Sequence, residues 1–383
     1  MVDSSAPPAP AGAGGAVEAK HLPEAWKLVR QMRDPFVAEI VCGVPSIDLP
    51  LNFRLPAEAR EWPSLDAALH VLSGSKFDPR TCRRNTTQYT PEEEGKLFSV
   101  ICPTNSNRRM WHGLLYECFQ AQRYEPKELV IVDTGTAPST KFEEIAKDDP
   151  RVVYNFFPVA DTKDPRANAD GKSKNQAWSL GLKRNIACRI ARGSVIAQFD
   201  DDDLYFPEYL DWFWPRVVQA AGADGDGLGP ALAKLSEWHL FDLANMAFHY
   251  MNPLERKCMP LREQPAALYG WGFSYVFTRR AWELSPFPDV HFAEDAGFVE
   301  GLLARGIPVS LLKIPEDRTL VAHTVHPSST TGGEVSVGQR GCDNPVQTPK
   351  EFDGLYRKLA ESVHTKAKHR HLIGQPQRGS RAR

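Results

Sequence analysis

Residues 193–207 read Gly-Ser-Val-Ile-Ala-Gln-Phe-Asp-Asp-Asp-Asp-Leu-Tyr-Phe-Pro, and the rest of the predicted fold is organised around them. Val195–Phe199 is short, apolar and rich in β-branched residues, which predicts a buried strand. The strand runs directly into four carboxylates, Asp200 to Asp203. Adjacent carboxylates repel one another and are costly to bury without a positive partner. Oxygen ligands of this kind suit Mg²⁺ or Mn²⁺. The alternative is a solvated acidic turn before a helix N-terminus.

The composition is that of an ordinary soluble globular protein. The chain has 383 residues, of which 42% are hydrophobic and 25% are charged, and this length suits one large domain with appendages or two domains. The formal net charge of −2 gives no overall attraction to nucleic acid or to a membrane surface, so neither is expected as a partner. The seven cysteines include no Cys-x-x-Cys pair, which argues against a zinc knuckle and a disulfide framework.

Two further absences bear on localisation. No run of about 18 apolar residues occurs, so no transmembrane helix is expected. The N-terminus lacks the basic-then-apolar order of a signal peptide. These observations predict a cytoplasmic protein.

The sequence divides into five predicted segments. Residues 1–20 offer little bulky apolar surface and predict a disordered N-terminus. Residues 21–94 predict an N-terminal appendage, and residues 95–335 predict the main domain. Residues 336–363 predict a C-terminal helical segment. Residues 364–383 contain Lys, Arg and His but no acid, which predicts a basic, disordered tail.

Strands and helices alternate in the middle of the chain. Leu97–Cys102, Leu129–Val132 and Val152–Phe157 each predict a strand. Apolar residues recur every four positions over 176–192, which predicts a helix. This alternation is typical of an α/β fold, in which parallel strands are joined by right-handed crossovers.

The second half of the main domain is less regular. Leu232–Leu243 and Gly270–Phe277 predict strands, and Arg279–Leu284 predicts a short helix. Glu294–Arg305 predicts a helix that ends at Gly306. Further predicted elements are strands at Ile307–Ile314 and Thr319–Val325 and one amphipathic helix from about residue 350.

Five pieces of the sequence occur in a recognisable order. They are Phe98-Ser-Val-Ile-Cys-Pro-Thr104, Val130-Ile-Val-Asp133, Lys183-Arg-Asn-Ile-Ala187, Phe199-Asp-Asp-Asp-Asp203 with Pro207, and Glu294-Asp295. Together they resemble the GT-A fold glycosyltransferases, in particular the large inverting family 2 typified by bacterial polysaccharide and cellulose-type synthases. The resemblance covers about residues 96–330.

This resemblance implies both a fold and a reaction. The implied fold is a GT-A (Rossmann-like), mostly parallel central sheet flanked by helices, with the N-terminal appendage outside it. The implied activity is metal-dependent, inverting transfer of a sugar to a hydroxyl acceptor, such as a carbohydrate. The donor would be a nucleotide-diphospho-sugar, and most often a UDP-sugar.

The resemblance also implies a donor site. The residues that would bind the nucleotide-sugar are Pro103, Thr104, Arg108, Asp133, Lys183, Arg184, Asp200 and Asp201. Asp133 would accept a hydrogen bond from the base or ribose, and its alternative is a turn-forming aspartate. Lys183 and Arg184 would reach diphosphate oxygens, and their alternative is an exposed helix face. The loop that carries Arg108 is one residue longer than the common form of the family.

In the acidic cluster, the resemblance favours Asp200 and Asp202 as the Asp-x-Asp pair, because the last apolar residue of the strand directly precedes Asp200. Asp200 would contact the ribose or a metal-bound water, and Asp202 would ligate Mn²⁺ or Mg²⁺. Asp203 would cap the following helix or orient the ligands. His326 would complete the metal site or touch the diphosphate. A lone histidine is more often structural, and His323 competes for this role.

Asp295 is the implied catalytic base, because inverting transfer needs one carboxylate to take a proton from the attacking hydroxyl. Trp271, beside Gly272, would form an acceptor platform, since an indole face covers the apolar side of a pyranose. Its alternative is a core tryptophan. Glu294 would hydrogen-bond an acceptor hydroxyl. The alternative for both acids is a helix N-terminus, where carboxylates are favoured.

Two rival functions stay open. A nucleotidyltransferase on a related sheet usually carries a Gly-rich loop after its first strand, and Pro103–Arg109 contains no glycine. A catalytically inactive carbohydrate-binding or scaffold protein would keep the fold without turnover. The presence of both Asp202 and Asp295 argues against the inactive protein, and a turnover assay separates the two.

Overall fold

The structure is a computed structural model that describes residues 64–159, 178–225, 227–255, 264–326 and 344–374. Its central element is a seven-stranded sheet. The strands are β1 (Phe98–Asn105), β2 (Lys127–Gly135), β3 (Val152–Pro158), β4 (Val195–Gln198), β8 (Leu232–Leu235), β11 (Val276–Thr278) and β12 (Val309–Leu312). Their order across the sheet is β12-β8-β11-β4-β1-β2-β3.

The sheet is mostly parallel, as the sequence predicts. Within it, β1 pairs in parallel with β2 and β4, and β8 pairs in parallel with β12. Only β11 runs antiparallel to its neighbours β4 and β8. The strand that leads into the acidic cluster, β4, lies fourth of seven. The strand that the sequence predicts to be buried therefore occupies the middle of the sheet.

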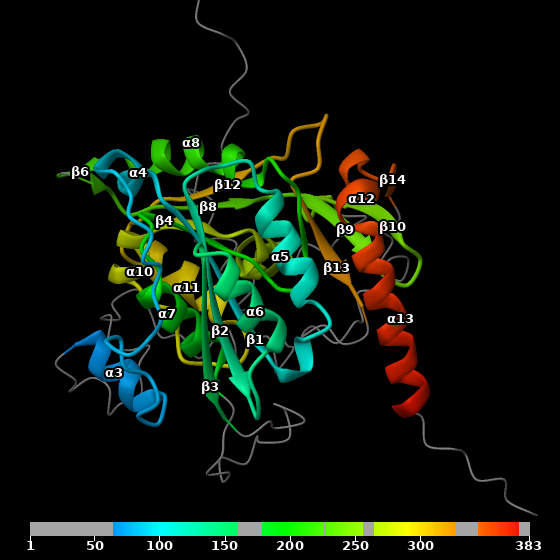
Figure 1. The fold of residues 1–383 in the computed structure, drawn as a ribbon. Coiled ribbons are helices and arrows are strands. Elements are labelled where there is room, and N and C mark those ends of the chain that lie inside the picture. The colour runs from blue at the N-terminus through cyan, green and yellow to red at the C-terminus, as the bar shows by residue number, and fades with distance from the viewer. Residues whose placement is uncertain (1–63, 160–177, 226, 256–263, 327–343, 375–383) are drawn as a thin grey trace, which may run out of the picture.

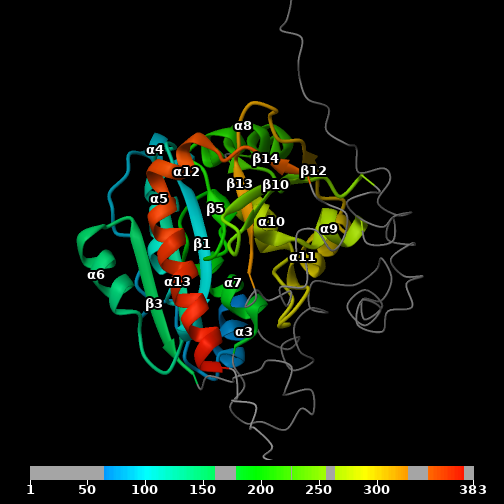
Figure 2. The same cartoon turned by 90° about the vertical axis from the view of Figure 1, so that its right-hand side faces the viewer.

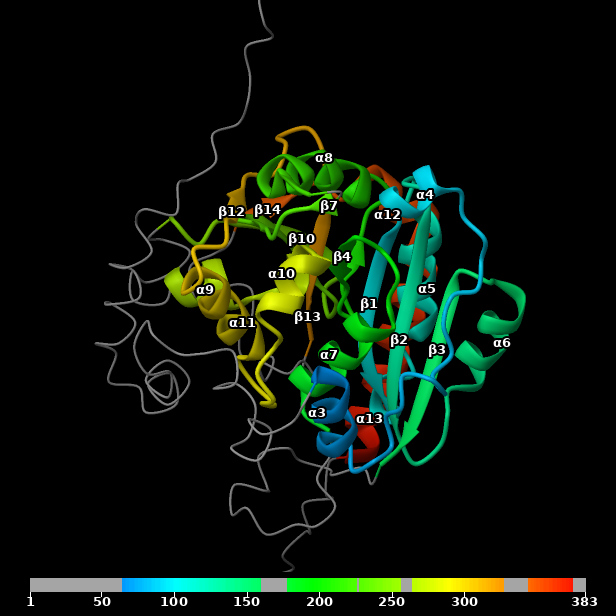
Figure 3. The same ribbon diagram turned by 90° about the vertical axis from the view of Figure 1, so that its left-hand side faces the viewer.

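Helices cover both faces of the sheet (Figures 1 and 3). One face packs against α5 (His112–Ala121), α6 (Thr140–Asp148) and α8 (Tyr209–Ala221). The other packs against α3 (Leu65–Leu72), α7 (Leu180–Ile190), α10 (Arg279–Leu284) and α11 (Glu294–Leu303). Along β1, Val100 and Cys102 belong to the first cluster and Ile101 to the second, because alternate side chains of a strand face opposite sides.

A second sheet lies beside the acidic cluster. Its strands are β5 (Leu204–Tyr205), β9 (Trp238–Asp242), β10 (Ala247–Met251), β13 (Val321–Val325) and β14 (Pro345–Val346), in the order β14-β10-β9-β13-β5. The predicted single strand Leu232–Leu243 is wrong, because its two ends belong to different sheets. The chain leaves the first sheet at Ser236, whose N–H donates to Leu312 O at 2.8 Å, and β9 then pairs with β13.

The predicted strand Gly270–Phe277 is also mostly wrong. Helix α9 (Gln264–Gly270) ends at Gly270, the residue at which the predicted strand was expected to begin. A 3₁₀ turn, η5 (Gly272–Ser274), then follows before β11. The turn closes with a hydrogen bond of 2.9 Å from Tyr275 N to Gly272 O. The apolar composition of this segment predicts burial correctly, but burial alone does not distinguish a strand from a tight turn.

The two ends of the described chain pack on the main domain. Near the N-terminus, α4 (Pro91–Lys96) precedes β1, and Arg189 of α7 holds Asp66 of α3 through bonds of 2.5 and 2.8 Å. At the other end, α12 (Lys350–Leu355) is followed by α13 (Arg357–Gly374), which lies beside α5 (Figure 2).

Helix α13 corrects the predicted boundary at residue 363, because it continues through Gly374. The first part of the predicted disordered tail is therefore helical. Residues 375–383, the predicted disordered N-terminus and residues 160–177 lie outside the described residues. Among the described helices, none is long and apolar enough to cross a membrane.

Candidate functional site

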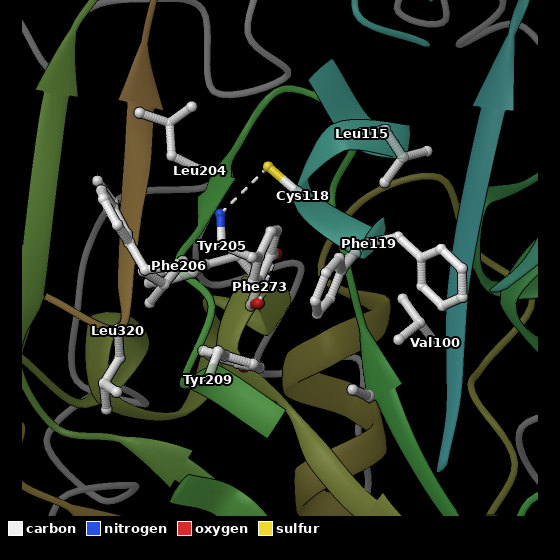
Figure 4. Close-up of a cluster of buried hydrophobic side chains, with 14 of the residues drawn as sticks. Val100, Leu115, Cys118, Phe119, Leu204, Tyr205, Phe206, Tyr209, Phe273 and Leu320 are labelled. Carbon is white, nitrogen blue, oxygen red and sulfur yellow. Dashed lines mark hydrogen bonds between the residues drawn. The ribbon is translucent and has the colours of Figure 1, made fainter. Parts of the chain in front are cut away.

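The acidic loop after β4 rests on a packed aromatic core (Figure 4). The ring of Phe199 stacks on Tyr205 with 3.6 Å between centroids. The Tyr205 hydroxyl accepts a hydrogen bond from Asp200 N at 3.0 Å and donates to Phe273 O at 2.8 Å. Tyr205 N in turn faces the Cys118 sulfur at 3.5 Å. These contacts hold the start of the loop against the sheet, so the direction of its carboxylates is fixed by packing.

Arg108 bridges two of the aspartates. Its Nε and Nη2 lie 2.8 and 2.6 Å from Asp201 Oδ1, and the guanidinium also pairs with Asp202. The Thr104 hydroxyl donates to Asp201 Oδ2 at 2.7 Å. Burial opposes the charged form of Arg108, but Asp201 and Asp202 outweigh it and raise the pKa of Arg108 well above its usual value. The structure thus brings Thr104, Arg108 and Asp201 together, as the sequence predicts.

Asp202 also contacts His326. The two side chains are buried, and His326 Nε2 lies 2.7 Å from Asp202 Oδ2. Burial favours the protonated acid, but the positive charge of Arg108 and the contact with His326 outweigh it and lower the Asp202 pKa. The predicted metal ligands are therefore adjacent.

Asp202 and His326 fit a divalent cation whose remaining ligands come from a bound substrate and water. Among the described residues, no group of three or more His, Cys, Asp or Glu side chains gathers into a complete metal site. Asp202 and His326 provide one oxygen and one nitrogen donor, and Mg²⁺ or Mn²⁺ commonly takes its other ligands from substrate phosphates and water. In this structure the guanidinium of Arg108 supplies the positive charge next to Asp202.

Asp203 does not cap the following helix, so that prediction is wrong. Its Oδ1 accepts from Thr324 N at 2.8 Å, and its Oδ2 lies 3.0 Å from His323 Nδ1. Burial opposes the charged imidazole of His323, but the Asp203 carboxylate outweighs it and raises the His323 pKa to about 9. The structure therefore separates the two candidate histidines: His326 contacts Asp202, and His323 holds Asp203 to β13.

Asp133 lies at the same edge of the sheet as the acidic loop, because it pairs in register with Thr104. Pro103 and Thr104 form the end of β1 beside it. Asp133 is fully buried, and its Oδ2 accepts from the Tyr154 hydroxyl at 2.6 Å. Its Oδ1 has no hydrogen-bond partner among the described residues. Burial raises the Asp133 pKa. An unpaired buried carboxylate oxygen is an acceptor without its donor.

Lys183 lies between these strand ends. Its Nζ is 3.1 Å from Thr104 O and 3.5 Å from Thr134 Oγ1. Burial lowers the Lys183 pKa to about 8. The amine is thus an N–H donor at the edge where β1 and β2 end.

Arg184 faces the other side of the site. It pairs with Glu294, with Asp295 Oδ1 at 2.6 Å and with Asp200 Oδ1 at 3.5 Å. Burial opposes its charge, but these carboxylates outweigh it and raise the Arg184 pKa. The sequence predicts contact with a diphosphate, whereas the structure brings Arg184 to the predicted acceptor-side acids. Arg184 therefore fixes the positions of Asp200 and Asp295 relative to each other.

The pKa values of the two acids of α11, Glu294 and Asp295, are shifted in opposite directions. Burial raises the Glu294 pKa well above its usual value. Burial also acts on Asp295, but Arg184 and a hydrogen bond with Glu294 outweigh it and lower the Asp295 pKa. Asp295 Oδ2 accepts from Gly272 N at 2.7 Å, and 14% of its side chain is exposed. Asp295 is thus an oriented carboxylate that solvent can reach.

Trp271 directly precedes Gly272, whose N–H donates to this carboxylate. It is half-buried, and its ring centroid is 5.2 Å from both Trp238 and His323. Trp271 is therefore neither a fully buried core residue nor an isolated surface ring. A partly open indole beside Gly272 suits the predicted acceptor platform.

Sequence reasoning misses two polar side chains behind Asp295. Lys234 of β8 and Gln198 of β4 directly follow Ala233 and Ala197, which both pair with Val276 of β11. Lys234 is fully buried, with Nζ 5.1 Å from the Trp238 ring and 3.3 Å from Leu235 O, and burial lowers its pKa to about 7. Neither polar atom of the Gln198 side chain has a partner among the described residues. The sequence feature that could have identified Lys234 is its position as a lysine inside an apolar strand.

Comparison with known proteins gives distant structural similarities only. No family model and no curated protein matches the chain. The structure of S. aureus TarS 1-349 in complex with UDP-GlcNAc matches with a TM-score of 0.39 and 15% identity over 74% of each chain. Another TarS 1-349 structure matches with a TM-score of 0.38 and 16% identity, and this chain spans only 60% of its length, through 60% of its own.

A third similar structure comes from Mycobacterium tuberculosis. It is glucosyl-3-phosphoglycerate synthase in complex with Mn²⁺, UDP and phosphoglyceric acid. It matches with a TM-score of 0.34 and 15% identity, over 78% of this chain and 88% of that chain.

Proposed function

We propose that residues 95–335 form a metal-dependent, inverting glycosyltransferase that moves a sugar from a nucleotide-diphospho-sugar, of the UDP class, to a hydroxyl acceptor. The observation that carries the proposal is that two separate clusters of charged side chains lie at one edge of the sheet. Arg108, Asp202 and His326 form a corner that calls for a cation. Asp295, held by Arg184 and Gly272, is a single oriented carboxylate on the other side.

The donor would bind across the ends of β1 and β2. Asp133 Oδ1 is a buried acceptor without a partner among the described residues, and an N–H of the base or a ribose hydroxyl supplies the missing donor. Lys183 would donate to the diphosphate, because its amine lies at the same edge and no carboxylate pairs with it at salt-bridge distance among the described residues. Thr104 and Arg108 orient Asp201 beside it.

Asp202 and His326 would hold Mn²⁺ or Mg²⁺ together with diphosphate oxygens. When bound, such an ion offsets the charge that develops on the departing diphosphate. Arg108, which pairs with Asp201 and Asp202, would offer its remaining N–H groups to phosphate.

Asp295 would be the general base. The acceptor oxygen forms a bond to the anomeric carbon, and the bond from that carbon to the diphosphate oxygen breaks, with its electron pair leaving on the diphosphate. The hydroxyl proton passes to a free lone pair of the Asp295 carboxylate. The lowered Asp295 pKa keeps this group ionised at neutral pH. Glu294 and the ring of Trp271 would position the acceptor.

The test is a thermal-shift panel of nucleotide-sugars with and without Mn²⁺, followed by an assay of transfer. A ligand at about 100 times its dissociation constant adds about 2.7 kcal/mol to the free energy of unfolding. We expect a UDP-sugar with Mn²⁺ to raise the melting temperature. Absence of any shift across the panel would refute the proposal. A shift without turnover on any acceptor would favour an inactive binding protein.

A further inference from the structure

A continuous chain of hydrogen bonds joins Asp133 to Asp201. The members between them are Thr104, His112, Ser139 and Tyr154, and none of the last three is predicted from the sequence. Thr104 Oγ1 lies 2.7 Å from Asp201 Oδ2 and 3.0 Å from His112 Nε2. His112 Nδ1 lies 2.8 Å from Ser139 Oγ. Ser139 N lies 2.6 Å from the Tyr154 hydroxyl, which lies 2.6 Å from Asp133 Oδ2.

The direction of each bond near His112 follows from the number of hydrogens. Asp201 is paired with Arg108, so its carboxylate accepts. Thr104 has one hydroxyl hydrogen and gives it to Asp201, so Thr104 Oγ1 must accept from His112 Nε2–H. Burial and the nearby charges of Arg109 and Arg108 lower the His112 pKa to about 3. The ring is therefore neutral, with its hydrogen on Nε2.

This tautomer of His112 also determines the donor and the acceptor in the remaining hydrogen bonds. Because Nδ1 of the neutral ring carries no hydrogen, it accepts from the Ser139 hydroxyl. Ser139 Oγ also accepts from Phe142 N at 3.4 Å, as the N-cap of α6. Ser139 N donates to the Tyr154 oxygen, which leaves the tyrosine hydrogen for Asp133. His112 is fully buried and lies between the two halves of this chain.

We infer that His112 is a positioning residue of the donor site: it directs the Thr104 hydroxyl hydrogen at Asp201 and thereby holds Asp201 and Arg108 in place for the diphosphate. This inference rests on the proposed function. Without the imidazole, Thr104 keeps a hydroxyl that turns freely between Asp201 and other acceptors. Arg108 then loses the fixed carboxylate that its Nε and Nη2 grip. The imidazole acts through Thr104 and does not itself touch the donor.

The test is calorimetry with UDP and Mn²⁺ on the whole chain. His112→Leu removes both hydrogen bonds, and we expect its UDP affinity to fall about ten- to hundredfold, as for the loss of one or two bonds to a charged network. His112→Gln keeps an amide N–H near the place of Nε2–H and should recover most of the affinity. His239→Leu is the matched control, because that ring has a free Nδ1 among the described residues and lies on β9.

A double-mutant cycle separates positioning from a merely structural role. If His112 acts through the Thr104 hydroxyl, then His112→Leu should cost little further affinity in a Thr104→Val background. Additive losses would overturn the inference. Ser139→Ala, which frees Nδ1, covers the case in which His112→Leu does not fold, and it should weaken UDP in the same direction.

The outcomes also separate this inference from the proposed function. Wild-type affinity for UDP in His112→Leu, or in Ser139→Ala when the leucine variant does not fold, overturns the role of His112 and leaves the proposed function standing. Failure of the wild-type chain to bind UDP with Mn²⁺ overturns both.

Discussion

Gly272 and Asp295 are joined by a hydrogen bond of 2.7 Å from the glycine N–H to Asp295 Oδ2. A Cβ added at Gly272 would lie 2.5 Å from the same oxygen and 2.6 Å from Gln198 Nε2. Real Cβ atoms do not approach other atoms this closely, so only glycine lets the backbone reach the carboxylate here. The absence of a side chain at position 272 thus sets the orientation of the proposed base.

Gly272→Ala should therefore reduce turnover with little loss of the fold. The methyl group must push Asp295 aside, and a misplacement of about 1 Å can cost about 10²-fold in rate. UDP affinity should be nearly unchanged, because the donor side is untouched. Gly95→Ala is the control, since no atom lies within 4 Å of its added Cβ. Initial rates and UDP titration compare the two variants, and full activity of Gly272→Ala would contradict the orienting role.

Asp295→Asn should reduce the rate of transfer by about 10²–10⁴, the usual contribution of a positioned general base. Asparagine keeps the shape but cannot take the proton, so UDP and Mn²⁺ should bind nearly as before. Glu294→Gln is the informative comparison. Burial raises the Glu294 pKa and Glu294 is not the proposed base, so its amide should cost far less. Rates at saturating donor, beside calorimetry, decide the matter. Equal activity of Asp295→Asn and the wild type would point to another base.

Asp202→Ala should abolish metal-dependent UDP binding. The diphosphate would lose the cation that offsets its charge, while His326 alone provides one weak ligand. Asp353→Ala, which removes an exposed carboxylate of α12, should leave binding intact. Titration of each variant with UDP, with and without Mn²⁺, is the measurement. Metal-dependent binding that survives in Asp202→Ala would exclude this residue as the ligand.

Lys234→Met should raise the melting temperature. Burial lowers the Lys234 pKa from its ordinary 10.5 to about 7, so the unfolded chain binds the proton more tightly than the folded one. The cost to stability is complete below about pH 7 and disappears as the pH rises toward 10.5. It amounts to as much as roughly 5 kcal/mol, since one pKa unit is worth about 1.4 kcal/mol.

The gain from Lys234→Met should thus be largest near about pH 6 and should shrink by about pH 9. Lys127→Met is the control. That lysine is also buried, but its Nζ lies 2.7 Å from Gln122 O and 2.5 Å from Glu125 Oε1, so its loss should destabilise the protein. Denaturant unfolding at the two pH values gives both comparisons. A gain that does not vary with pH would argue that Lys234 stays charged in the folded state.

The sequence predicts a strand correctly where the whole apolar segment belongs to one sheet. Val195–Phe199 has no polar alternation and lies in the middle of the sheet, buried on both faces. Leu232–Leu243 also reads as one strand, but the chain changes sheets at Ser236. Hydrophobicity reports that a residue is buried and not which sheet it joins. Tertiary pairing with β12 and β13 decides that, and no local pattern encodes it.

The sequence identifies those residues of the candidate site that are carboxylates without a positive partner nearby in the sequence. The acidic cluster and the acids at the start of α11 stand out, because buried carboxylates require distant cations. The sequence does not say which cation each one meets. Arg184 was expected at the phosphates and instead contacts Asp295. His112 and Lys234 give weaker signals, because single polar residues in apolar segments become informative only once their neighbours are known.

The order of charged partners along the chain has a consequence for biosynthesis. Arg108 and Arg184 precede the acidic loop, whereas His323 follows Asp203 by 120 residues and His326 follows its own partner by 124. When a ribosome has made the loop, the guanidinium partners already exist and the imidazole partners do not. A nascent chain that stops before β13 can form all seven strands of the large sheet. Asp203, which is fully buried in the complete chain, would still lack a counter-charge, so the edge that carries the acidic loop matures only after the sheet beneath it.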